Sequence, residues 1–155
     1  MNVANADILL VEDNAADAEL ALESLRSESL AGGVCHVHDG VEALDYMFGR
    51  GAYASRAVAA RPHIILLDIK LPRVDGFGVL RELKADPRTR LTPIVMLTSS
   101  IVERDVALCY RLGASSYVQK PVDFEQFRTT VRAVARYWLR VSAAVPARAF
   151  TERAP

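Results

Sequence analysis

Short apolar runs alternate with longer amphipathic segments along the chain. The runs lie at positions 8–11, 34–37, 64–67, 94–97 and 116–118. Segments with apolar residues at helical spacing lie at 17–30, 41–48, 76–84 and 103–112, and a last long one follows Asp123. Runs that are apolar throughout are typical of parallel strands buried on both faces. The pattern therefore predicts an α/β fold in which five strands are each followed by a helix.

Capping residues predict where the helices begin and end, and the composition near the end of the chain predicts where the domain ends. Asn14 and Asp39 stand where the first two helices would begin, and Gly113 stands where the fourth would end. The length of 155 residues suits one domain, which we expect to span 6–143. The segment 144–155 has two prolines and no periodicity, which predicts a flexible tail and no second domain.

Composition narrows the possible function classes. The chain has 19 basic and 19 acidic residues, whereas a nucleic-acid-binding domain normally has a strong basic excess. No apolar run approaches the length of about 20 residues that a membrane helix needs, and no secretory signal pattern is visible. Two cysteines are too few for a disulfide framework. We therefore expect a cytoplasmic protein that binds neither nucleic acid nor membrane.

The charge is distributed unevenly along the chain. Residues 1–60 hold 10 acids and 3 bases, a net charge of −7, which the segments 61–120 and 121–155 offset with +4 and +3. An acidic first part of the chain indicates a site that handles a cation.

Polar residues follow four of the five predicted strands. The first strand ends at Glu12 and Asp13, the third at Asp68 and the fourth at Thr98, and Lys120 follows the fifth. The carboxyl ends of parallel strands meet at one edge of a sheet, where ligands bind in open α/β folds. Three carboxylates at this edge would repel one another without a divalent cation, and Mg²⁺ prefers oxygen ligands.

These groups together suit phosphoryl transfer. Asp68 would attack a phosphoryl donor, while Mg²⁺ and Lys120 would neutralise charge on the transferring oxygens. Thr98 would donate a hydrogen bond to the acyl phosphate. Each residue alone has a common structural role, such as an acid near a helix N-terminus or an aspartate in a turn. Their joint occurrence at four strand ends favours the chemical interpretation.

Four segments carry a family resemblance: ILLVEDN, HIILLDIKLPRVDGFGVL, IVMLTSS and GASSYVQKPVD. Over about residues 6–140 the chain resembles the receiver domain of two-component response regulators. The resemblance implies a flavodoxin-like, doubly wound parallel sheet with strand order 2-1-3-4-5 and an extended C-terminal helix. It also implies a single-domain regulator, without an output domain, that accepts a phosphoryl group on Asp68 from a sensor histidine kinase. Such a protein is a signalling switch and not a turnover enzyme.

The resemblance also implies a set of metal ligands. Mg²⁺ would bind Asp13, Asp68 and the main-chain carbonyl of Lys70, and would bind Glu12 through a water. The side chain of Lys70 is a departure, because phytochrome-type receivers more often carry Asn there. That side chain would either reach the phosphoryl group or the acidic cluster, or lie exposed in solvent.

A switch is implied in the same way. Thr98 and Tyr117 would be the switch pair, and Lys120 the lysine that senses the phosphoryl group. The resemblance places a tight turn after Lys120, for which we expect a cis bond to Pro121.

A narrower resemblance concerns the receivers that are paired with bacterial phytochromes. The long connection 49–61, the segment ALDYMFGRGAY and the sequence YWL late in the last helix are similar to theirs. This implies a histidine kinase of the phytochrome type as the partner.

The last predicted helix carries more apolar surface than the end of a receiver helix normally buries. The surplus residues are Tyr137, Trp138, Leu139 and Val141. Large apolar residues on a protruding helix indicate an interface, and a two-fold contact would bury them against a second copy. We therefore expect a homodimer through the fourth helix, fifth strand and fifth helix.

Arginines recur every four residues on the same helix, at Arg128, Arg132, Arg136 and Arg140. In the dimer they would meet acidic residues of the second subunit, namely Glu103, Asp105 or Asp123.

Two other function classes stay open. An Asp-nucleophile phosphatase of the haloacid dehalogenase type also places Asp at a strand end with Mg²⁺, but it carries a second Asp two residues later, where this chain has Lys70. A flavodoxin-like cofactor carrier needs a phosphate loop rich in Ser, Thr and Gly after the first strand, where VEDNAAD offers carboxylates. Activity on a generic phosphate ester would support the first class, and a coloured protein the second.

Overall fold

Strand and helix alternate through the chain, as the apolar pattern predicts. The computed structural model describes residues 6–28, 30 and 33–152. The strands are β1 (Ile8–Val11), β2 (Val34–Val37), β3 (Ile64–Leu67), β4 (Ile94–Thr98) and β5 (Ser116–Gln119). The helices are α1 (Ala15–Arg26), α2 (Gly40–Phe48), α3 (Gly76–Ala85), α4 (Glu103–Leu112) and α5 (Phe124–Arg136). A short 3₁₀ turn, η2 (Gly51–Tyr53), lies in the long connection before β3.

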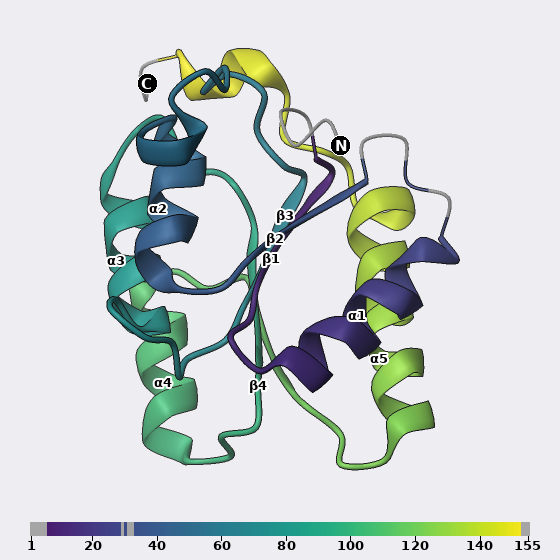
Figure 1. Ribbon diagram of the computed structural model, residues 1–155. Coiled ribbons are helices and arrows are strands. Elements are labelled where there is room, and N and C mark those ends of the chain that lie inside the picture. Colours follow the sequence, from purple (N-terminus) through teal and green to yellow (C-terminus); the bar gives the residue numbers. More distant parts are fainter. Residues whose placement is uncertain (1–5, 29, 31–32, 153–155) are drawn as a thin grey trace.

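The five strands form one parallel sheet in the order β2-β1-β3-β4-β5, which confirms the expected topology. Helices α2, α3 and α4 cover one face, and α1 and α5 cover the other (Figure 1). The chain moves outward from β1 to β2 and then returns to β3 on the other side of β1. In this type of sheet, ligands bind at the carboxyl ends of the strands beside such a reversal, which here are the ends of β1 and β3.

The sheet is buried on both faces, as apolar strands require. In β1, Leu9 and Val11 belong to the core beneath α2, α3 and α4, whereas Ile8 and Leu10 belong to the core beneath α1 and α5. All four are almost fully buried, and each such side chain contributes about 1.5–3 kcal/mol. The sheet is therefore a rigid base for the polar residues that follow its strands.

The predicted capping residues are confirmed. The side chain of Asn14 accepts a hydrogen bond from the Asp17 amide at 2.9 Å, and α1 begins at Ala15, earlier than the apolar pattern suggests. The side chain of Asp39 accepts one from the Glu42 amide at 2.8 Å. Helix α4 ends at Gly113, which has a left-handed φ of 105°.

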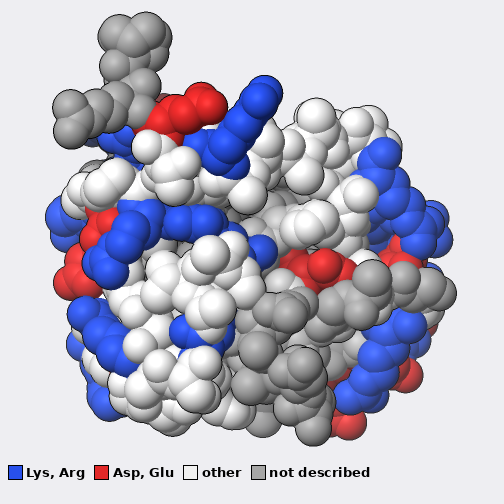
Figure 2. Space-filling view, turned by 90° about the horizontal axis from the view of Figure 1, so that it is seen from above, with Lys and Arg blue, Asp and Glu red and all other residues white. Residues whose placement is uncertain are grey.

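The C-terminal part of the chain returns across the end of the sheet where the strands begin (Figure 1). Helix α5 continues as a π-helical turn, η3 (Tyr137–Val141), and a 3₁₀ turn, η4 (Ala147–Phe150), follows. The guanidinium carbon of Arg61 lies 3.9 Å from the centre of the Phe150 ring. The turn η4, which includes Phe150, falls in the expected tail 144–155, and the flexibility of that tail stays a prediction. Figure 2 views this end and shows basic side chains spread over the described surface.

No helix in the described part of the chain is both long and apolar enough to cross a membrane.

Gly76 at the start of α3 is packed against the strand end that carries Asp68. A Cβ on Gly76 would lie 2.2 Å from the Asp68 carbonyl oxygen, so Gly76→Ala must displace backbone at the site. We expect it to lower the free energy of unfolding by about 1–3 kcal/mol in urea titrations. Gly78→Ala is the control, because its Cβ would meet side-chain atoms and no backbone: a methyl group of Val74 at 2.8 Å and Oδ1 of Asp75 at 3.6 Å. Equal losses in the two variants would contradict the prediction.

Candidate functional site

The carboxyl ends of β1, β3 and β5 converge on one ammonium group. The Nζ of Lys120, which follows β5, lies 2.6 Å from Glu12 Oε2 and 2.7 Å from Asp68 Oδ2. It also lies 3.1 Å from Oδ2 of Asp17, in the first turn of α1. Glu12, Asp68 and Lys120 are only 2%, 6% and 8% exposed. The structure thus brings together residues that are more than 100 positions apart in the sequence.

Main-chain groups hold the two buried carboxylates in place and fix the backbone of Lys120. The amide of Asn14 donates to Glu12 Oε1 at 3.1 Å, and the amide of Ile69 donates to Asp68 Oδ1 at 2.7 Å. The amide of Lys120 donates to the carbonyl oxygen of Thr98 at 2.8 Å, which ties the end of β5 to the end of β4. The orientation of the carboxylates follows from local backbone geometry.

The charges at the site depend on one another. Burial raises the pKa of Glu12 to about 7, against the opposing effect of the Lys120 ammonium. Burial alone would lower the pKa of Lys120, but its hydrogen bonds to Asp68 and Glu12 outweigh burial and raise it above the ordinary lysine value. Lys120 is therefore charged at neutral pH, and it opposes the effect of burial on Glu12.

Three carboxylates form a group that can hold a metal ion. Oxygen atoms of Glu12, Asp13 and Asp68 all lie within 4.8 Å of one another, and no other such group occurs among the described residues. Asp13 is exposed, so the group is open to solvent on one side. Carboxylate oxygens without histidine or cysteine fit a hard divalent cation such as Mg²⁺.

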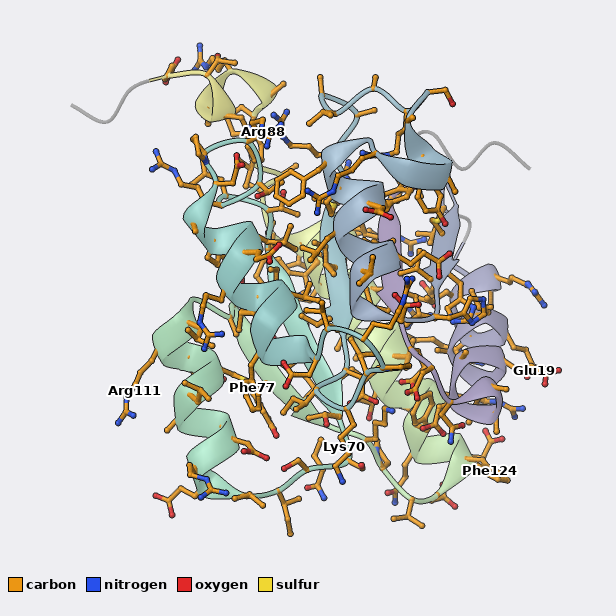
Figure 3. All side chains as sticks on the ribbon, turned by 60° about the vertical axis from the view of Figure 1, so that its left-hand side comes forward. Glu19, Lys70, Phe77, Arg88, Arg111 and Phe124 are labelled. Atoms are coloured by element: carbon orange, nitrogen blue, oxygen red, sulfur yellow. The ribbon has the colours of Figure 1, made fainter. Side chains whose placement is uncertain are left out.

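Lys70 lies in the turn after β3, and its side chain is exposed. Figure 3 shows it at the end of the molecule opposite the C-terminal turn η4. Among the described residues its ammonium group has no hydrogen-bond or ion-pair partner, so an effect on the phosphoryl group stays a prediction.

Thr98 and Tyr117 are connected through Ser100. Thr98 is fully buried at the end of β4, and its hydroxyl oxygen lies 3.4 Å from the Ser100 amide that donates to it. The hydroxyl of Tyr117 donates to the Ser100 carbonyl at 2.9 Å. The backbone of one residue in the β4–α4 loop therefore contacts both members of the expected switch pair.

Sequence reasoning missed three residues of the site: Asp17, Ser100 and His36. The Nε2 of His36 on β2 lies 2.8 Å from the Glu12 carbonyl oxygen and so fixes the end of β1. Asp17 stands in the first turn of α1, where an acidic residue commonly complements the helix dipole. That common role concealed its contact with Lys120.

The expected cis bond between Lys120 and Pro121 is wrong. The described backbone contains no cis peptide bond. With a trans bond the Lys120 ammonium already reaches Asp68 and Glu12, because the Thr98 carbonyl fixes the Lys120 amide at the strand end.

The apolar residues of the α5 extension point in different directions. Trp138 and Leu139 pack against the core beneath α1 and α5. Tyr137 and Val141 are 50% and 73% exposed.

Three of the four arginines of α5 and its extension, Arg128, Arg136 and Arg140, have partners inside the described chain, and their pairing with a second subunit stays a prediction. Arg128 pairs with Glu23 at 3.2 Å and with Glu125 at 2.6 Å. The Nε of Arg136 lies 3.0 Å from the buried Glu28 carboxylate, and Arg140 donates to the Glu28 carbonyl at 2.7 Å. Helices α1 and α5 lie side by side on one face of the sheet (Figure 1). The Arg128–Glu23 pair joins them, and the contacts with Glu28 join the far end of α5 and its extension to the segment that follows α1.

The parallel sheet, the acidic group and the lysine opposite Asp68 define a receiver domain. The family model of the response regulator receiver domain matches residues 8–132, and the chain belongs to this family.

Its relatives include regulators associated with phytochromes. Response regulator Rcp1 of Synechocystis sp. is 35% identical over 132 residues, which cover 85% of this chain and 88% of Rcp1. The crystal structure of its Mn²⁺-bound form matches with a TM-score of 0.83, over 90% of this chain and 98% of that one. The phosphorylated cyanobacterial phytochrome response regulator RcpA is 37% identical, with a TM-score of 0.85 over 92% of this chain and all of RcpA. The bacteriophytochrome response regulator AtBRR is 46% identical, with a TM-score of 0.67 over 82% and 91% of the two chains.

Removal of the Lys120 charge should destabilise the protein. Lys120→Met leaves the buried Glu12 and Asp68 without a counter-charge, and we expect a loss of about 3–5 kcal/mol in the free energy of unfolding. Mg²⁺ should restore part of this loss, because a cation among the carboxylates replaces the missing charge. Urea titrations with and without Mg²⁺ measure both effects.

Lys84→Met is the matched control. The Lys84 ammonium donates to the carbonyl oxygens of Arg90 and Thr92 and meets no carboxylate, so Mg²⁺ should not offset its loss. Equal responses of the two variants to Mg²⁺ would overturn the prediction.

Proposed function

We propose that this protein is a single-domain response regulator that accepts a phosphoryl group on Asp68 from a sensor histidine kinase. The observation that carries the proposal is the Lys120 ammonium, which lies 2.7 Å from Asp68 Oδ2 beside the carboxylates of Glu12 and Asp13. A nucleophilic carboxylate, a fixed cation and a set of metal ligands are the groups that phosphoryl transfer needs. The family of the chain supports the same function.

The side chains at the site have separate tasks in this reaction. A carboxylate oxygen of Asp68 forms the bond to phosphorus while the bond to the donor breaks, and the Ile69 amide keeps the carboxylate oriented. Lys120 neutralises charge on the phosphoryl oxygens. Asp13, Asp68 and the Lys70 carbonyl would hold Mg²⁺ directly, and Glu12 would hold it through water. When bound, the metal ion neutralises charge on the transferring group.

The switch is proposed to run from Thr98 to Tyr117. The Thr98 hydroxyl would donate to the acyl phosphate and give up its contact with the Ser100 amide. Because the Tyr117 hydroxyl is bonded to the same residue, a shift of Ser100 changes the position of the Tyr117 ring. A coupling of this kind is typically worth about 1–3 kcal/mol.

The proposed partner is a histidine kinase of the phytochrome type. The similarity to Rcp1, RcpA and AtBRR supports this pairing. We place the protein in the cytoplasm, where the free cysteines Cys35 and Cys109 suit the reducing conditions. Membrane and nucleic acid are not proposed as partners.

Enzymatic turnover is not part of the proposal. A phosphatase with an Asp nucleophile would need an acid or base two residues after Asp68, and the exposed Lys70 stands there. Hydrolysis of a generic phosphate ester by the purified protein would support the phosphatase instead.

Asp68→Asn should abolish phosphorylation by acetyl phosphate or by a cognate kinase, because the amide lacks the nucleophilic oxygen. Intact-protein mass measured in the presence of Mg²⁺ reports the product. Asp13→Ala is the comparison, because it keeps the nucleophile and should raise the Mg²⁺ concentration needed for half-maximal phosphorylation. Incorporation at the wild-type rate in Asp68→Asn would refute the function.

We further propose that the protein forms a homodimer through α4, β5 and α5. Strand β5 lies at the edge of the sheet. Tyr110 of α4 covers this edge, because its hydroxyl oxygen accepts a hydrogen bond from the Tyr117 amide at 3.1 Å. The side chain of Tyr110 is itself 50% exposed. Tyr137 and Val141 add exposed apolar surface on the extension of α5. Exposed large apolar residues are typical of the centre of an interface, which supports a contact through these elements.

Val141→Asp should weaken the dimer at least about tenfold, because it places a charge in the proposed contact. Light scattering across protein concentrations, with and without a phosphoryl mimic, measures the effect. Val122→Asp is the control, because Val122 is 97% exposed in the turn after Lys120, outside the proposed contact. A monomer at tens of micromolar in every condition would end this proposal.

A further inference from the structure

Asp17 is a third carboxylate partner of Lys120. Its Oδ2 lies 3.1 Å from Nζ, and it reaches the ammonium from α1, whereas Glu12 and Asp68 reach it from the ends of β1 and β3. The Asn14 side chain caps α1 through the Asp17 amide, and the Asn14 amide donates to Glu12. The start of α1 is therefore locked to the end of β1 in a position that points Asp17 toward Lys120.

Asp17 differs from the other two partners in what else it touches. Glu12 and Asp68 belong with Asp13 to the group that can hold a cation, and Asp17 does not. The side chain of Asp17 is 37% exposed, and Lys120 is its only ion-pair partner among the described residues. Asp17 thus remains available to Lys120 when a metal ion and a phosphoryl group occupy the other carboxylates.

We propose that Asp17 is a positioning residue for Lys120 in phosphoryl transfer, an inference that rests on the proposed function. Asp17 holds one proton of the ammonium from the side of α1. In the unphosphorylated protein, the other two protons of the ammonium form hydrogen bonds to Glu12 and Asp68. During transfer, phosphoryl oxygens accept these two hydrogen bonds instead.

The physical reason lies in the lysine side chain. Four rotatable bonds separate its charge from the backbone, and fixing such a chain costs rotamer entropy. If Glu12 and Asp68 were its only partners, Lys120 would lose its anchors at the moment when its position matters. A third anchor outside the reacting group keeps the cation preorganised.

The test is the rate of Asp68 phosphorylation by acetyl phosphate at saturating Mg²⁺ in full-length variants. Asp17→Ala should slow it about three- to tenfold, the effect of one charge-assisted hydrogen bond reduced by partial exposure. Asp17→Asn should retain more of the rate than Asp17→Ala, because its amide oxygen still accepts from the ammonium. The Mg²⁺ midpoint should move less than twofold in both variants.

Glu19→Ala is the matched control. Glu19 lies two residues further along α1, is exposed, and points away from the body of the protein (Figure 3). The change removes the same charge from the same helix, so the Glu19→Ala variant should be phosphorylated at the wild-type rate. In a Lys120→Met background, Asp17→Ala should not lower the phosphorylation rate any further, because Asp17 acts through Lys120.

The outcomes separate this inference from the proposed function. No phosphorylation of the wild type at Asp68 would overturn the function and, with it, the role of Asp17. A phosphorylated wild type that Asp17→Ala matches in rate would overturn the positioning role alone. A shift of the Mg²⁺ midpoint by more than twofold, or a loss of rate that persists in full in the Lys120→Met background, would also overturn it.

Discussion

One buried ammonium group shared by three carboxylates determines how the rest of this site is arranged. Lys120 joins the ends of β1, β3 and β5 and the first turn of α1 through contacts of 2.6–3.1 Å. Such a buried cluster contributes little net stability, since the desolvation of the charges offsets their attraction. In the proposed phosphoryl transfer, its value would be that the charges are already in place before the phosphoryl group arrives, so that little reorganisation remains during the reaction.

The apolar sheet makes this arrangement possible. Repulsion among Glu12, Asp13 and Asp68 would spread flexible segments apart, but each of these residues follows a strand that is buried on both faces. Gly76 lets α3 approach the Asp68 carbonyl so closely that no side chain fits between them. Packing in the two cores therefore holds the acidic residues at short distances, and the ammonium compensates for part of their repulsion.

Much of this architecture could be predicted from the sequence. Apolar strands, capping residues such as Asn14 and Asp39, and the polar residues at four strand ends are local signals with a direct physical meaning. The family resemblance supplied the strand order, which is confirmed, and the cis bond before Pro121, which is wrong. A property inferred by resemblance holds only where the local geometry of this chain requires it.

Contacts between distant residues could not be predicted in the same way. Asp17 looks like an ordinary acid at a helix N-terminus, and the link from Thr98 to Tyr117 through Ser100 depends on the path of a loop. The arginines of α5 look like a free charged stripe, because the sequence does not show that α1 lies beside them. In each case the residue has a common local role that the sequence shows. Its second role, a contact with a distant residue, is visible only in the structure.

The two ends of α5 connect the site to the surface proposed for the dimer. At its beginning the helix follows Lys120, whose amide is bonded to the Thr98 carbonyl. At its far end Arg136 and Arg140 are fastened to the buried Glu28, which anchors the extension to the segment that follows α1 and leaves Tyr137 and Val141 on the outside. With that end fixed, the helix resists displacement as a whole when the β5–α5 turn moves. In the proposed switch, a signal from Asp68 would therefore reach the proposed dimer face through the contacts of Ser100 with Thr98 and Tyr117, and not through a shift of α5.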